Sequence, residues 1–156
     1  MRRSDREVTD PNEILSIMAR SQVVTLGLWG DDAPYLLPVN FGMEPDGMTL
    51  YIHGAMTGKK YDLLACNPHV GFNMIACSEI VEEGAECSTN FESVSGWGVV
   101  EELTEKTEKY EALRRILEHD GHGDLPVDPK VAVCTRVLRL GIRERTGKRR
   151  KGKSKC

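Results

Sequence analysis

Residues 50–64, LYIHGAMTGKKYDLL, change from a strand pattern to a helix pattern within a few positions. In the first part, alternation predicts Leu50 and Ile52 on one face of a strand, with Tyr51 and His53 on the other. Small residues then break the strand, and a helix pattern runs over about residues 57–66, where Asn-Pro follows. The segment therefore predicts a strand, a tight turn and a helix, with His53 at the turn.

Two lysines stand at the expected start of this helix. The amino end of a helix already carries partial positive charge, so Lys59 and Lys60 oppose the macrodipole there unless an anion compensates. The hydroxyl of Thr57, free N–H groups and the small Gly58 suit a phosphate. The alternative is a pair of exposed lysines that only solvate the surface.

Histidines offer two further hypotheses. His53 could donate a hydrogen bond to a bound ring or move a proton, because its ordinary pKa of about 6.5 leaves both forms accessible; the alternative is a structural histidine at a strand end. His119 and His122, with Asp120 or Asp124, suggest metal ligands. Histidine at a helix end followed by glycine also complements the dipole, so we expect no metal site.

The chain of 156 residues has the length of one soluble domain. Of its 21 basic residues six lie after residue 147, where there is no acid, so residues 1–147 carry a formal charge of −9. We expect a domain over residues 1–147 and a basic, disordered tail over residues 148–156. No apolar run is long enough for a membrane span and none follows the charged amino end, which favours a cytoplasmic protein. The five scattered cysteines lack a C-x-x-C pair and are expected to be reduced thiols.

Extended patterns outnumber helical ones, and most consecutive strands have no helix between them, which favours an antiparallel barrel over a parallel sheet. Gly96 and Gly98 within one strand suggest a bulge or the close approach of a ligand. The expected strands are residues 23–29, 35–43, 48–55, 69–81, 89–103 and 130–144.

Two amphipathic helices are expected besides the one at the lysines. Asp10 should cap the first, with Pro11 at its first position and Glu13 completing a capping box. Thr104 is the expected cap of the second, over residues 104–119.

Five segments in a fixed order carry a family resemblance. They are MRRSDREVTDPNEI, PYLLPVNFGME, LYIHGAMTGKKYDLL, ESVSGWGVVEEL and IRERTGK. With them the chain resembles the nitroimidazole-resistance (Nim) flavoproteins of the pyridoxamine 5'-phosphate oxidase-like superfamily, over residues 1–148. The resemblance implies a mainly β (α+β) fold, an FMN-binding split β-barrel of six antiparallel strands in Greek-key order with a few flanking helices. It also implies a homodimer with FMN in clefts at the subunit interface.

The resemblance also assigns site residues. A strand would run along the flavin ring, with backbone groups of Val39 and Asn40 at its polar edge, and the turn to Lys60 would hold the phosphate. His53 would be the catalytic residue, beside the flavin and the substrate. The implied cofactor-binding residues are Pro38, Val39, Asn40, Phe41, His53, Thr57, Gly58, Lys59, Lys60, Ser93, Ser95 and Gly96.

By this resemblance we expect an FMN-dependent oxidoreductase that takes electrons from an external donor and reduces a small compound, such as a nitroaromatic of the 5-nitroimidazole kind. The basic substrate-phosphate motif of true pyridoxamine phosphate oxidases is missing, so that activity is not expected. The alternative is a non-enzymatic flavin, haem or deazaflavin binder; for haem, the possible axial ligands include His53 and His69. Nucleic-acid binding through the tail is not expected, because the acidic body would repel it.

Overall fold

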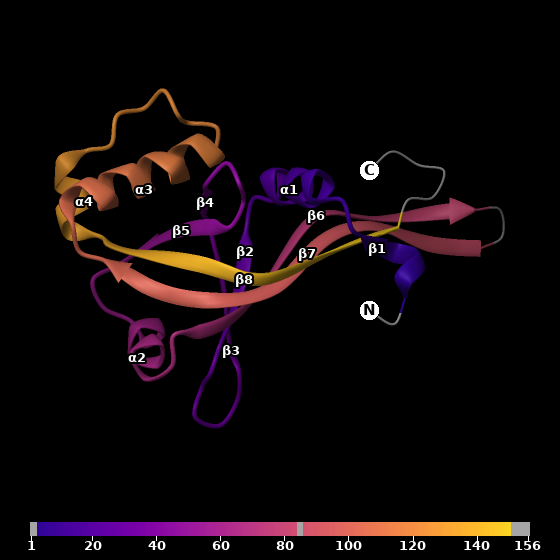
Figure 1. Cartoon of the computed structure of the whole chain (residues 1–156), viewed down its shortest axis with the longest axis horizontal. Helices are drawn as coiled ribbons and strands as arrows, with labels where there is room; N and C mark the ends of the chain where they lie inside the picture. Colours follow the sequence, from indigo (N-terminus) through magenta and orange to yellow (C-terminus); the bar gives the residue numbers. More distant parts are fainter. Residues whose placement is uncertain (1–2, 84–85, 151–156) are drawn as a thin grey trace.

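The computed structural model describes residues 3–83 and 86–150, and one curled antiparallel sheet dominates it (Figure 1). The strand order is β3-β2-β6-β7-β8-β5-β4, with β1 paired to β8. Within the described residues the end strands β3 and β4 do not pair with each other, so the sheet forms a half-barrel. The predicted split, mainly β architecture is confirmed. The strands are β1 (Glu7–Val8), β2 (Val24–Leu28), β3 (Tyr35–Val39), β4 (Gly42–Met43), β5 (Thr49–Gly54), β6 (His69–Glu83), β7 (Glu86–Leu103) and β8 (Arg136–Arg150).

The described residues therefore contain two more strands than the six predicted, β1 and β4, both of two residues. The predicted strand over residues 35–43 is divided, because the chain leaves the sheet at Asn40 and Phe41 and re-enters it at β4. Pro38 lies in β3, which pairs only with β2, and an edge strand tolerates the missing N–H.

The three longest strands form a ribbon that extends past the barrel as an arm beside α1 (Pro11–Arg20) and β1 (Figure 1). β8 continues along β7 to Arg150, which pairs with Phe91. This corrects the expected start of the tail at residue 148, because Lys148 pairs with both β1 and β7, and Arg149 and Arg150 pair with β7. The rest of the predicted tail lies outside the described residues.

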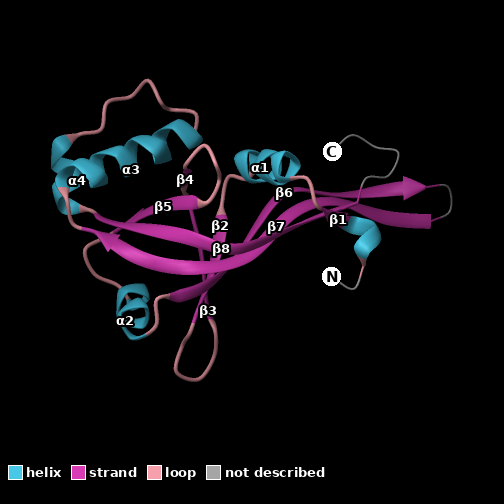
Figure 2. Cartoon of the chain, viewed as in Figure 1, coloured by secondary structure: helices cyan, strands magenta, loops and turns pink. Residues whose placement is uncertain are grey.

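The helices sit on the sheet at separate places (Figure 2). α1 starts as predicted, because the Asp10 carboxylate accepts a hydrogen bond from the N–H of Asn12 at 2.8 Å and Pro11 takes the first position. The capping box is wrong, since the carboxylate of Glu13 instead accepts a hydrogen bond from Arg149 at 2.9 Å. The remaining helices are α2 (Lys59–Cys66), α3 (Lys106–His119), α4 (Pro129–Cys134) and a 3-10 turn, η1 (Ser4–Arg6).

Two helix predictions need correction. The segment before β8 was expected to be strand, but it forms α4, because the Asp128 side chain accepts from the N–H of Lys130 at 2.8 Å and Pro129 fixes the first turn. The β-branched residues Val131 and Val133 favour a strand, so the sequence pattern does not reveal this second Asp-Pro helix start. α3 has Glu105 rather than Thr104 as its N-cap residue, without a side-chain cap bond.

The core has two parts. The larger lies inside the curl of the sheet and contains Leu50 and Ile52, both fully buried, as the alternation predicted. The smaller lies between α3, α4 and the sheet, where Leu113 and Ile116 pack on Val137. This second core fixes α3 and α4 at the end of the sheet that carries β5 (Figure 1).

The predicted bulge in β7 is confirmed, with the register shifting between Trp97 and Gly98. A Cβ added at Gly96 would meet the carbonyl oxygen of Glu144 and lie 2.8 Å from the Phe72 ring. At Gly98 it would meet the carbonyl oxygen of Gly141. Neighbouring strands and a core ring therefore account for both glycines within one chain.

The oxidation state of the cysteines differs from the prediction at one position. Cys66, Cys87 and Cys134 are free and exposed, as expected. Cys77 is disulfide-bonded, so the prediction of reduced thiols is wrong there. Spacing along the chain does not reveal which thiols the fold brings within bonding distance. Separately, no helix in the described part of the chain is long and apolar enough to cross a bilayer.

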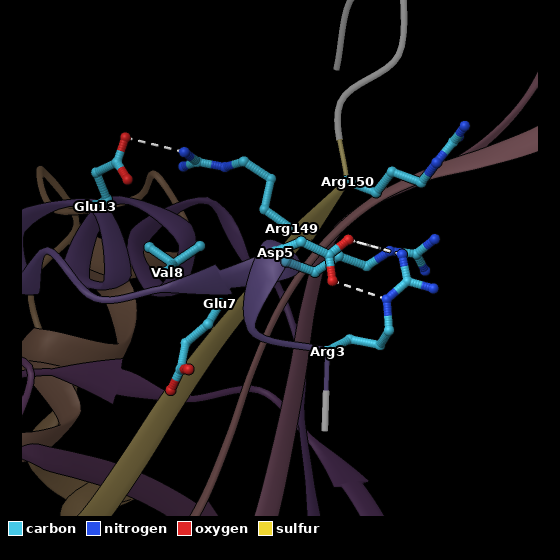
Figure 3. A pocket seen from close by; sticks show the side chains of 8 residues that line it. Arg3, Asp5, Glu7, Val8, Glu13, Arg149 and Arg150 are labelled. Atoms are coloured by element: carbon cyan, nitrogen blue, oxygen red, sulfur yellow. Dashed lines mark hydrogen bonds and ion pairs between the residues drawn. The ribbon is translucent and has the colours of Figure 1, made fainter. Parts of the chain in front are cut away.

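A buried ion-pair network joins α1 to the arm. Glu92 on β7 is 1% exposed, and its carboxylate oxygens lie 2.7 Å from Arg20 and 2.7 Å from Arg149. Arg149 also reaches Glu13 beside a charged cavity of about 380 Å³ (Figure 3). Burial by itself would raise the pKa of Glu92, but the bonds and charges of Arg20 and Arg149 outweigh it and lower that pKa.

We expect Glu92→Gln to lower the free energy of unfolding at pH 7 by about 2 kcal/mol, because it leaves a buried arginine contact without its charge. Urea titration measures this. Since the folded-state pKa is lowered, the advantage of the wild type is present above the carboxyl's ordinary pKa of about 4.3 and is lost as pH falls through the folded-state value. Glu101→Gln is the matched control, an exposed carboxylate on the same strand that pairs with Arg139. Equal losses in the two variants would contradict the prediction.

Candidate functional site

The strand, turn and helix predicted from residues 50–64 are present, and the turn places His53 close to the start of α2. Part of the His53 surface is exposed. Partial burial of the ring lowers its pKa, the charge of Lys60 lowers it further, and Asp120 acts weakly in the opposite direction. The imidazole is therefore predominantly neutral at pH 7 and can donate or accept a hydrogen bond.

Lys60 folds back over the strand end. A Cβ added at Gly54 would meet the Lys60 Nζ and lie 2.7 Å from the hydroxyl oxygen of Tyr61, so glycine makes room for both side chains. The ammonium lies 5.0 Å from the centre of the Tyr61 ring. Burial lowers the pKa of Lys60, and the neighbouring charge of Arg136 adds to the effect. A bound anion at this position would offset both effects and stabilise the charged form of Lys60.

Tyr61 and Arg136 complete a polar cluster with Lys60. The guanidinium carbon of Arg136 lies 3.7 Å from the centre of the Tyr61 ring, and Arg136 forms an ion pair with Glu102. Tyr61 is 6% exposed, and its buried hydroxyl has no hydrogen-bond partner within the described residues. A buried hydroxyl without a partner costs about 1–3 kcal/mol, so this group points to a ligand or a bound water.

Sequence reasoning missed both of these residues. Tyr61 directly follows the lysine pair, and its position in the first turn of α2 was the available signal. Arg136 is far away in the sequence and reaches the site because β8 pairs with β5, where Arg136 is opposite Gly54.

The two lysines diverge. Lys59 is exposed, and its Nζ lies 5.6 Å from the centre of the Tyr35 ring on β3. Thr57 and Gly58 are also exposed, and Gly58 has a φ of +151°, which favours glycine. Of the two lysines, Lys60 is therefore the one that belongs to the cluster with Tyr61 and Arg136, and Lys59 lies in solvent near Tyr35.

The segment after β3 approaches the same end of the sheet. Pro38 and Asn40 are exposed, while Val39 is half-buried. The amide of Asn40 donates to the Asp120 carboxylate at 3.5 Å, and Asp120 is also the acid that acts on His53. Asn40 and His53 thus have a common neighbour.

Phe41 has a different position from its neighbours. Its side chain is fully buried, and its ring centre lies 4.1 Å from that of His119. His119 Nε2 is 2.8 Å from the carbonyl oxygen of Ser21. A ligand contact of Phe41 would therefore come from its backbone, and the contacts of His119 are those of a packing residue.

The predicted residues on β7 lie elsewhere in the same chain. Val137 on β8 is opposite both His53 and Leu103, which puts these two residues level across the sheet. Ser95 is eight residues farther along β7, or roughly 26 Å of strand. Its hydroxyl accepts from the Asn73 amide at 2.9 Å, and Ser93 and Gly96 are beside it. One chain therefore does not bring the β7 residues to the Lys60 cluster.

The fold is that of the split-barrel class, and in it Lys60, Arg136 and the unpartnered hydroxyl of Tyr61 lie together at the junction of β5, α2 and β8. The family model described as pyridoxamine 5'-phosphate oxidase matches residues 10–149, and the chain belongs to that family. Among curated proteins no match is found.

Solved structures give the same fold. A protein from Bacteroides thetaiotaomicron, provisionally assigned to 5-nitroimidazole antibiotic resistance, is 26% identical with a TM-score of 0.82 over 91% of this chain and 85% of its own. The flavocytochrome Anf3 from Azotobacter vinelandii is 23% identical, with a TM-score of 0.81 over 97% of this chain and 72% of its own. An FAD- and haem-binding protein from Mycobacterium smegmatis is 21% identical, with a TM-score of 0.80 over 94% and 74%.

Proposed function

We propose that this protein binds FMN at the Lys60 cluster and is a flavin-dependent reductase of small compounds, including nitroaromatic ones. The observation that carries the proposal is the unpartnered hydroxyl of Tyr61 beside the Lys60 ammonium, at the start of α2 and within a fold whose relatives bind flavins. These groups suit the phosphate of a flavin mononucleotide.

In this proposal Lys60 and Tyr61 donate hydrogen bonds to phosphate oxygens, and the free N–H groups at the start of α2 add to them. Arg136 remains paired with Glu102 and contributes its charge from the far side of the tyrosine ring. The absence of a side chain at Gly54 keeps the lysine and tyrosine close to the strand. A terminal phosphate, with two negative charges, gains most from such a cluster, which favours FMN over FAD.

The ring of the flavin would lie along the end of β3, where backbone groups of Val39 and Asn40 are available. The bound flavin supplies the electron transfer. His53, held at the end of β5, orients a substrate group, and its protonated form, the minor one at pH 7, donates a proton to that group. Electrons come from an external reduced donor, such as a reduced nicotinamide.

A homodimer completes the proposed site. Because Ser93, Ser95 and Gly96 lie far from Lys60 in one chain, they can line the flavin cleft only from a second copy. Exposed apolar side chains on the sheet support association, since Ile75 is 56% exposed and Trp97 is 43% exposed. Sedimentation equilibrium should therefore give twice the mass of the chain.

The decisive experiment is an anaerobic absorption spectrum of the protein with FMN, before and after addition of a reduced nicotinamide. Flavin bands that shift on binding and bleach on reduction would support the proposal. A haem Soret band in the purified protein would favour the alternative of a haem binder, in keeping with the two haem-type relatives. If the absorption bands of FMN are the same with and without the protein, the flavin assignment is overturned.

A further inference from the structure

A cavity of about 260 Å³ is lined by His53 and by residues of α3, α4 and the loop between these helices. Apart from His53 and Asp128, the residues that line it are apolar. These apolar residues are Leu113, Ile116 and Leu117 of α3, Pro126 and Val127 of the following loop, and Val131 of α4.

The walls of this cavity are fixed by packing. Leu113, Ile116 and Val127 are buried members of the second core, and His53 belongs to a sheet strand. Asp128 holds the start of α4 by accepting from the N–H of Lys130 at 2.8 Å. The cavity is therefore part of the folded chain and does not depend on a mobile segment.

The lining selects an occupant by size and polarity. Apolar walls favour an apolar body, because its removal from water is the main gain on binding. The volume is just below the range of about 300–1,000 Å³ typical of drug-sized ligands, which favours a molecule smaller than the three-ring flavin or a haem. A molecule with one aromatic ring fits, and its polar substituent would lie at the neutral imidazole.

We propose that this cavity binds the aromatic ring of the substrate, a single-ring molecule whose polar substituent contacts His53. The proposal rests on the proposed function, because it makes His53 the common wall of the substrate cavity and the flavin site. Lys60 is near enough to lower the pKa of His53, and the same ring lines the cavity, so the histidine is close to both. Here α3 and α4 set the substrate's size and class, while the Lys60 cluster holds the cofactor.

The test uses 4-fluoronitrobenzene as the probe and ¹⁹F NMR line broadening as the readout, on the flavin-free full-length protein. We expect saturable binding to the wild type and at least roughly tenfold weaker binding to Val131→Phe, which adds a ring at the cavity wall. Leu117→Phe fills the cavity from the opposite helix and should act in the same direction. Val133→Phe is the matched control, since Val133 is exposed on α4 but does not line this cavity.

Absence of saturable binding to the wild type would overturn the proposal. So would equal binding by the wild type, both filling variants and the control. Thermal melting of each variant verifies that it is folded. Because the probe is measured without flavin, a failure of the flavin assignment leaves this result readable, and a failure of the cavity leaves the flavin spectrum unchanged.

Discussion

Replacing Lys60 with alanine is expected to weaken FMN binding about 100-fold, near the upper end of what one charge-assisted hydrogen bond contributes. Lys60 is half-buried over Gly54 and faces the unpartnered hydroxyl of Tyr61. Without this ammonium, the hydroxyl of Tyr61 and the helix N–H groups would be the remaining hydrogen-bond donors to the phosphate, and Arg136 would contribute only its charge. Quenching of flavin fluorescence on titration with the protein measures the dissociation constant.

Lys59→Ala is the matched control for this prediction. Lys59 has the same charge and is adjacent in sequence, but it is exposed and lies near Tyr35. We expect a change of less than about threefold, and one that fades as salt is added, because exposed charges are screened. If the two variants weaken binding equally, the phosphate is not centred on Lys60.

These two lysines also mark the limit of what the sequence reveals about the site. The strand-to-helix change and the face of His53 follow from local periodicity, and the structure confirms both. The divergence of the lysines depends on rotamers and on the space over Gly54, which no local pattern encodes. Arg136 joins the site only through the pairing of β5 with β8, so its role depends on long-range register.

Errors in the predicted fold have a related physical origin. Residues 130–134 have strand propensity, yet the Asp128 cap and Pro129 determine a helix, so local hydrogen bonding overrides propensity. The basic charge of residues 148–150 predicts a disordered tail. This segment is strand because Arg149 pairs with the buried Glu92, a partner 57 residues away.

The separation of β7 from the Lys60 cluster concerns quaternary structure. A resemblance supplies site residues as one set, without saying which of them each of the two chains provides. The described residues place Ser95 and His53 at different ends of the sheet. The assembly can therefore be tested through these residues. If the β7 residues contact flavin, a monomeric variant must lose that contact while it keeps the Lys60 cluster.

His53→Ala is expected to lower the turnover of a nitroaromatic substrate about 100-fold, the lower end of what a positioned proton donor contributes. FMN affinity should change little, because the proposed site puts the histidine at the flavin ring and the substrate and leaves the phosphate to Lys60 and Tyr61. Steady-state reduction under anaerobic conditions, expressed per bound flavin, measures the effect. A variant with full flavin occupancy and unchanged turnover would remove His53 from the mechanism.

The pH dependence separates proton donation from mere positioning. Because burial and then Lys60 lower the pKa of His53 below its ordinary value of 6.5, only a small fraction is protonated at pH 7. If the protonated ring is the proton donor, turnover must rise as pH falls from 8 towards that lowered pKa, since the protonated fraction grows about tenfold per pH unit above it. His53→Gln retains a hydrogen-bond donor but does not titrate, so its profile should be flat over this range. A wild-type profile as flat as that of the glutamine variant would leave His53 with orientation alone, and the proton would then have to come from solvent.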